Sequence, residues 1–109
     1  MLKLIARIIF FESNARIPKD RIGYGTQHVL RPAFKFGEDL LFSGIIKGDD
    51  NPSTFRYNQP YVVTVDFPTI KDEAYKLIRP LIKAGMDINI QTGARVIGRA
   101  TLLDYTYSP

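Results

Sequence analysis

Cysteine is absent from this chain of 109 residues, and histidine occurs only once. A chain without cysteine has no disulfide framework, no thiolate zinc site, no iron–sulfur cluster and no thiol nucleophile. We interpret the single histidine, His28, as a structural or surface residue, because its spacing suggests neither a nucleophile nor an orienting partner. We therefore expect a protein that is not an enzyme, with no catalytic residue, no metal and no cofactor.

Long hydrophobic runs are absent as well. No segment approaches the ~18 uninterrupted apolar residues that a membrane-spanning helix requires. Arg7 interrupts the apolar opening, residues 1–11, and no small-residue cleavage site follows it, so we interpret it as a strand and not as a signal peptide. We expect a cytoplasmic protein with no membrane partner.

Basic residues outnumber acidic ones by 15 to 11, which gives a net charge of +4. Residues 1–35 contain seven basic and two acidic residues, a net charge of +5. Residues 36–73 contain three basic and seven acidic residues, a net charge of −4. Residues 74–109 contain five basic and two acidic residues, a net charge of +3. The basic ends suit RNA phosphates, and the acidic middle suits a basic protein surface. A solvated surface of mixed sign is the alternative interpretation, because no run of five like charges occurs.

Length and composition predict one globular domain over residues 1–109, since 45% of the residues are apolar and 24% are charged. Period-two alternation and β-branched or aromatic side chains predict that this domain is built from short strands. In residues 2–11 one face is wholly apolar, with Leu2, Leu4, Ala6, Ile8 and Phe10. We expect further strands at residues 28–36, 40–47, 54–57, 61–67, 86–92 and 95–103.

One short helix is predicted near residues 70–79, because apolar residues there have helical spacing and Pro80 ends the helix after about two turns. Thr69 or Asp72 is the expected N-cap. Gly93 is expected to have a positive φ in a tight turn, and Gly98 to mark a bulge or a sharp bend. Many short strands with little helix predict an all-β barrel or sandwich.

Three segments resemble a known β-barrel. Residues 31–36, Arg-Pro-Ala-Phe-Lys-Phe, resemble the Arg-Pro-x-Phe-x-Phe strand of the C-terminal barrel, the third domain, of bacterial elongation factor Tu. Residues 90–98 resemble the closing hairpin of that domain, with Gly93, Arg95 and Gly98 at matching positions, and residues 58–68 resemble the strand entry between the two. The resemblance implies a six-stranded Greek-key barrel; the short helical insertion near residues 70–79 is predicted from the helical spacing given above.

The chain departs from this family in two respects. Residues 20–27 lack the His-Thr-Pro sequence that helps the family's barrel to hold the T stem of aminoacyl-tRNA, and the loop before them is longer. No phosphate-binding loop of the Gly-x-x-x-x-Gly-Lys-Ser/Thr type is present, so we expect neither GTPase activity nor a nucleotide triphosphate as partner.

A basic loop around Gly23-Tyr24-Gly25 is the first candidate site. Glycine amides and nearby cations suit a phosphate, and the tyrosine ring suits a stacked base. The loop corresponds to the tRNA-facing region of the resembling family, and the alternative is a plain connecting loop. The candidate RNA-binding residues are Arg16, Lys19, Arg21, Tyr24, Arg31, Arg95 and Arg99.

Asp49, Asp50 and Tyr75 are the candidate protein-binding residues. The two aspartates lack calcium-loop spacing and suit a basic protein surface or a solvated turn, and Tyr75 belongs to an apolar stripe that suits either a partner or the core. We predict a non-enzymatic binding module that contacts another protein, as an immunity protein or inhibitor does. The alternative is a translation-related module that binds tRNA or another structured RNA through the basic loop.

Overall fold

The computed structural model describes residues 1–11, 32–48 and 57–108 of the chain. Its strands are β1 (Leu2–Phe10), β2 (Ala33–Phe36), β3 (Leu40–Ser43), β4 (Ile45–Gly48), β5 (Tyr61–Phe67), β6 (Asp87–Thr92) and β7 (Arg95–Tyr107). The helix α3 (Glu73–Ile78) and the 3-10 turn η1 (Arg79–Leu81) lie between β5 and β6. The predicted all-β character with one short helix is confirmed for the described residues.

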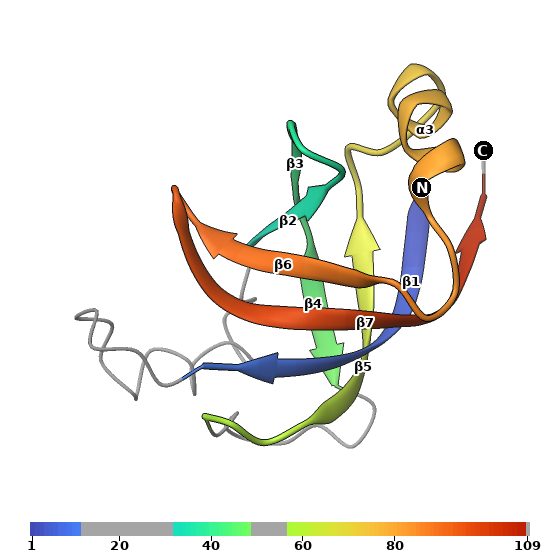
Figure 1. Ribbon diagram of the computed structural model, residues 1–109. Coiled ribbons are helices and arrows are strands. Elements are labelled where there is room, and N and C mark those ends of the chain that lie inside the picture. The colour runs from blue at the N-terminus through green and yellow to red at the C-terminus, as the bar shows by residue number, and fades with distance from the viewer. Residues whose placement is uncertain (12–31, 49–56, 109) are drawn as a thin grey trace.

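The seven strands form one antiparallel sheet in the order β3-β2-β6-β7-β1-β5-β4. The sheet curls strongly, so that its two ends turn toward each other around a common interior, and α3 lies at one end beside both chain termini (Figure 1). The architecture is therefore a curled half-barrel, as the strand content predicted.

The resemblance implies six strands, whereas the described residues form seven, because Gly44 divides the segment 40–47 that we expected as one strand. The expected strand at residues 54–57 lies outside the described residues except for Tyr57. Before this glycine β3 pairs with β2, and after it β4 pairs with β5. A Cβ atom at residue 44 would lie 2.6 Å from Val65 Cγ1 and 2.7 Å from Phe34 Cε1. The chain thus changes its pairing partner at a buried position where only glycine has room.

The alternating side chains of β1 contribute one whole face to the hydrophobic core. Its five predicted apolar residues, Leu2, Leu4, Ala6, Ile8 and Phe10, are completely buried. Phe67 lies between Phe34 and Phe36 in edge-to-face contacts, with ring centroids 5.2 and 5.4 Å apart. Such contacts are a preferred geometry for aromatic rings, and they join β2 to β5 across the interior.

The hairpin of β6 and β7 confirms both glycine predictions. Gly93 has a φ of +60° in the turn, and the register of the two strands shifts between Ile90 and Gln91, opposite Gly98. A Cβ atom on Gly98 would lie 2.5 Å from the carbonyl oxygen of Ile9, so β7 approaches β1 closely there. β7 continues to Tyr107, beyond the predicted end at residue 103.

The helix ends where it was predicted to end, with Ile78 buried and Pro80 in the following 3-10 turn. Asp72 is the N-cap residue, but its side chain makes no capping hydrogen bond and its φ is +47°. Its backbone N–H instead donates to the hydroxyl of Tyr107, at 2.7 Å. The prediction of Asp72 as the N-cap is therefore confirmed in position, but the hydrogen bond at this terminus is accepted by a tyrosine from the end of β7 and involves no aspartate side chain.

Candidate binding surfaces

Only three of the predicted site residues, Arg95, Arg99 and Tyr75, lie in the part of the chain that the structure describes. The other predicted site residues and the single histidine lie outside the described residues; they are Arg16, Lys19, Arg21, Tyr24, His28, Arg31, Asp49 and Asp50. Their roles stay predictions, and the surfaces below are built from residues 1–11, 32–48 and 57–108.

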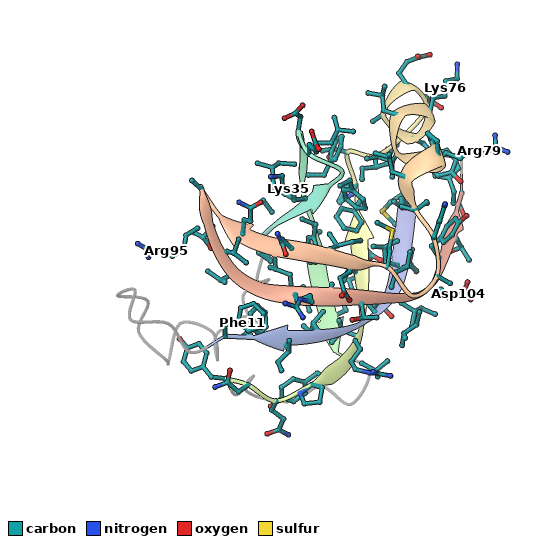
Figure 2. The ribbon with its side chains drawn as sticks, viewed as in Figure 1. Phe11, Lys35, Lys76, Arg79, Arg95 and Asp104 are labelled. Carbon is teal, nitrogen blue, oxygen red and sulfur yellow. The ribbon has the colours of Figure 1, made fainter. Side chains whose placement is uncertain are left out.

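Arg95 and Arg99 are both exposed on β7. Arg95 follows the turn of the β6–β7 hairpin, and its side chain points away from the sheet into solvent (Figure 2). The guanidinium carbon of Arg99 lies 5.6 Å from the ring centroid of Phe11, which is within the range of a cation–π interaction. The structure therefore brings one candidate cation onto an aromatic ring at the end of β1.

A polar row crosses three strands beside Arg99. Asn89 on β6 pairs with Arg99 on β7 and with Lys35 on β2. The row of Lys35, Asn89 and Arg99, named here the basic row, thus has an amide between two cations. Phosphate oxygens accept hydrogen bonds from all three side-chain types, so the basic row has the chemistry needed to contact the phosphate backbone of a nucleic acid.

Tyr75 is packed within the molecule. Its ring is partly buried and stacks on Tyr107, with centroids 3.7 Å apart and an interplanar angle of 3°. Ile78, one turn further along the helix, is fully buried, whereas Leu77 is 57% exposed. The stripe therefore packs on the barrel through some of its members, and a protein contact through Tyr75 stays a prediction.

Three exposed apolar residues lie together on the outer face of β5, β1 and β7. They are Ile5, Val62 and Leu103, which are 38%, 50% and 38% exposed. Val62 on β5 pairs with Arg7, which is two residues along β1 from Ile5. Leu103 on β7 lies at a register shift, next to Asp104, and Asp104 pairs with Ile5. The three residues thus lie on one face of three adjacent strands, with Val62 diagonal to Ile5 and Leu103 beside it, and we name them the outer-face patch.

Sequence reasoning missed this patch. Its only signal was Ile5, which stands between Lys3 and Arg7 on the mixed face of residues 2–11 that also carries Ile9 and Phe11. The strands that bring Val62 and Leu103 beside it are distant in the chain, and only their register places them together.

Charges of opposite sign flank the outer-face patch. Lys3 and Arg7 are exposed on β1. Asp104 is exposed on β7, and Asp87 is exposed on β6, where it accepts a hydrogen bond from Thr101 Oγ1 at 2.7 Å. Figure 2 shows Asp104 toward the opposite end of β7 from Arg95, which lies at the hairpin turn.

Asp66 is a buried acidic residue on the same face of β5, only 5% exposed. Its Oδ2 atom pairs with Lys47 Nζ at 2.8 Å, and its Oδ1 atom lies 4.0 Å from Lys3 Nζ. Oδ1 is buried and accepts no hydrogen bond. This carboxylate is flanked by two cations, so it neutralises part of the positive charge of the neighbouring strands.

The described residues contain neither a candidate metal-ligand cluster nor a helix that could span a membrane. No group of three or more histidine, cysteine, aspartate or glutamate side chains there is arranged to hold a metal ion. Within the same ranges, no helix has the length and apolar character needed to cross a membrane.

Comparison with known proteins adds no assignment. No protein-family model matches the chain, and no curated protein matches it. The resemblance to the elongation-factor barrel therefore stays a prediction, and the surfaces described above carry the functional argument.

Proposed function

We propose that this chain is a non-enzymatic binding module that acts through protein contact, with the outer-face patch as its contact surface. The observation that carries the proposal is the exposure of Ile5, Val62 and Leu103 on the same face of three adjacent strands. Protein interfaces characteristically have an apolar centre and a polar rim. The charged residues around the patch supply such a rim, and the role of an immunity protein or inhibitor belongs to this class of function.

The proposed fold family is the C-terminal barrel of elongation factor Tu, as a cytoplasmic domain without a nucleotide site. The pairing supports a six-stranded form, if residues 40–48 count as one bent strand that joins β2 to β5. In that form β2, the bent strand and β5 follow one another in the chain and lie side by side in the sheet, and β1 lies beside β5. Three consecutive neighbouring strands with a fourth strand beside them have the order of a Greek key.

Site-specific photo-crosslinking tests the protein-contact function. A photo-reactive amino acid placed at residue 62 in the full chain, expressed in the cells that make it, is expected to give an adduct of discrete mass. The same amino acid at residue 77 is the matched control, because Leu77 is equally apolar and 57% exposed but lies on α3. Absence of any adduct from residue 62, or equal adducts from both sites, contradicts the proposal.

RNA binding is the second candidate function, and the basic row favours it. Arg99 lies over Phe11 while Lys35 and Asn89 continue the row, which combines cations with an aromatic ring. Filter binding to bulk tRNA is expected to weaken steeply with rising salt, because bound counterions are released from the phosphates. Arg95→Ala with Arg99→Ala should reduce this binding and its salt slope, whereas Arg79→Ala on η1 should not.

Absence of tRNA binding at low salt would exclude this second candidate. Equal loss in the Arg79→Ala control would show that general positive charge, and not the basic row, attracts the RNA.

A further inference from the structure

The strand β3 forms one edge of the curled sheet (Figure 1). It pairs with β2 on one side, and no strand among the described residues pairs with its other side. An edge strand has backbone N–H and C=O groups without partners in the sheet, so it can serve as a template for a further strand. The question is which groups of β3 are free and what chemistry surrounds them.

One hydrogen bond fixes which backbone groups of β3 point to the free edge. The N–H of Gly44 donates to the carbonyl oxygen of Pro32 at 3.1 Å, and the register of the two strands makes these residues partners. Hydrogen-bonded pairs alternate with non-hydrogen-bonded pairs in an antiparallel ladder. Counting back from residue 44, the N–H and C=O groups of Leu41 and Ser43 therefore point away from β2. In the described part of the chain no hydrogen bond reaches them.

The side chains of β3 leave this edge unprotected. Edge strands commonly carry lysine, proline or a bulge, which discourage pairing with another chain. The sequence of β3 is Leu-Leu-Phe-Ser, and its pairing with β2 shows no register shift. Leu41 is 49% exposed, and Ser43 is exposed as well. The free edge thus combines unpaired backbone groups with an apolar side chain, although its length of four residues limits an added strand to two hydrogen-bonded pairs.

The turn that leads into β3 is acidic. Glu38 and Asp39 are exposed there, and neither forms an ion pair with another described residue. The cation that pairs with β3 is Lys35, but it belongs to β2, on the opposite side of β3 from the free edge. Lys76 and Arg79 lie at α3 and η1, apart from Lys35 (Figure 2). A segment bound along the free edge therefore ends beside two carboxylates that a lysine or arginine would complement.

We propose that the free edge of β3 binds an extended basic segment of another protein, which joins the sheet as an antiparallel strand. In strand addition the backbone hydrogen bonds supply affinity and alternate side chains supply specificity. The residues of the segment opposite Ser43 and Leu41 exchange backbone hydrogen bonds with them, and an apolar residue opposite Leu41 covers its side chain. The residues that follow lie beside Glu38 and Asp39, so they are the basic ones. This surface lies on a different strand from the outer-face patch, and the inference goes beyond the proposed function.

Charge selects a basic segment over a second copy of this chain. The β3 edge of a second copy would present Leu-Leu-Phe-Ser again, which contains no cation. Pairing of two such edges would leave Glu38 and Asp39 of both protomers without a partner. A segment with lysine or arginine after its paired residues satisfies the backbone groups and the carboxylates together.

NMR titration of the full chain with a synthetic peptide tests the proposal. The probe is the peptide Thr-Val-Val-Thr-Lys-Lys, blocked at both ends, and the control peptide has glutamate in place of lysine. We expect the amide signals of Leu41 and Ser43 to shift with a Kd of about 0.1–1 mM, since the paired segment is short. Their exchange with solvent should slow about tenfold when the peptide is at about ten times its Kd.

Proline at residue 43 tests strand addition directly. Ser43→Pro removes an N–H that points to the free edge, so the ladder with β2 stays intact, and proline is tolerated at such positions. This variant should bind the lysine peptide about tenfold or more weakly than the wild-type protein, because one hydrogen bond is lost and the ring obstructs the edge. Ser43→Ala keeps the N–H and should bind within about twofold of the wild-type protein. Urea unfolding checks that both variants fold.

Charge reversal in the turn tests the basic occupant without touching the strand. Glu38→Lys with Asp39→Lys should weaken the lysine peptide by about fivefold or more at low salt, and the variant should prefer the glutamate peptide. Wild-type binding of the two peptides with equal affinity would overturn a basic occupant.

The remaining outcomes also decide against the proposal. No shift at Leu41 and Ser43 with about 5 mM lysine peptide overturns it, as does unchanged binding in Ser43→Pro. Slow exchange of the two amides without peptide, in a chain that sediments as a dimer, would make a second copy the occupant and overturn the basic segment. None of these results bears on the crosslink from residue 62, so this inference and the proposed function fail independently.

Discussion

The ring of Tyr75 lies flat against the ring of Tyr107, with their centroids 3.7 Å apart. The first residue belongs to α3 and the second to the end of β7, so this stack attaches the only α-helix among the described residues to the last strand. The hydroxyl of Tyr107 also accepts the hydrogen bond from the backbone N–H of Asp72, at the start of the helix. One side chain thus provides both the packing surface and the terminal hydrogen bond of α3.

Tyr107→Phe is therefore expected to destabilise the protein by about 1 kcal/mol, because it removes one hydrogen bond and keeps the stacked ring. Tyr107→Ala should cost about a further 1 kcal/mol or more through loss of the aromatic pair. The free energy of unfolding in urea measures both. Tyr105→Phe is the control, since Tyr105 is partly buried on the same strand but donates or accepts no such bond at a helix terminus. Equal effects at both positions would show that the capping bond contributes nothing.

Gly44→Ala is expected to destabilise the protein by about 1–3 kcal/mol, because the added methyl group would overlap Val65 and Phe34. Thermal or urea unfolding measures the loss. Val65→Ala in the same chain should recover part of it, since it removes the closest atom, and the two changes should then be less than additive. Ser43→Ala, at the exposed neighbouring position, should have little effect. Additive losses in the double variant would contradict a steric cause.

The sequence allowed much of this fold to be predicted because several signals were local. Alternation in residues 2–11 identified the buried face of β1, and Pro80 limited the helix to its observed end. Gly93 and Gly98 were recognised because a glycine in a short turn signals a positive φ and a glycine inside a strand signals a bulge or a close backbone approach. Each of these features follows from the chemistry of a few consecutive residues.

The rest depends on contacts between distant parts of the chain. Nothing beside Gly44 indicates that the strand changes partner there, because the reason is crowding by side chains from β2 and β5. The end of β7 was placed too early: Tyr105, Thr106 and Tyr107 have strand-forming side chains, and the register shows that they pair with β1 as far as Leu2. The outer-face patch likewise depends on register, so its three residues could not be grouped from the sequence.

The ion pair of Asp66 and Lys47 predicts an asymmetric response to mutation. Lys47→Ala leaves a buried carboxylate with only Lys3 nearby, at 4.0 Å, and should destabilise the protein by about 1–2 kcal/mol. Asp66→Asn with Lys47→Ala should restore part of this loss, because a neutral amide costs less to bury than an unpaired charge. Urea unfolding at neutral pH measures each variant. Lys76→Ala, which removes an exposed pair with Glu73, should change the stability by less than about 0.5 kcal/mol. A Lys47→Ala loss no larger than that control would contradict the argument.

Gly98→Ala and Gly93→Ala separate two different reasons for glycine in the β6–β7 hairpin, a close backbone approach and a positive φ. At residue 93 nothing lies within 4 Å of an added Cβ. Alanine there should therefore lower the stability by about 1–2 kcal/mol, only because the backbone has a positive φ. At residue 98 the added atom meets the backbone oxygen of Ile9 at 2.5 Å, and a backbone atom of a paired strand cannot rotate away. Gly98→Ala should therefore be the more damaging change, and it should loosen β1 from β7 locally.

Hydrogen exchange of the backbone amides in residues 8–10 and 97–100 measures this local loosening. After correction for global stability, exchange is expected to speed up in Gly98→Ala and to stay near the wild-type rate in Gly93→Ala. The reverse order of the two variants would mean that turn conformation, and not the close approach of β7 to β1, limits this part of the barrel.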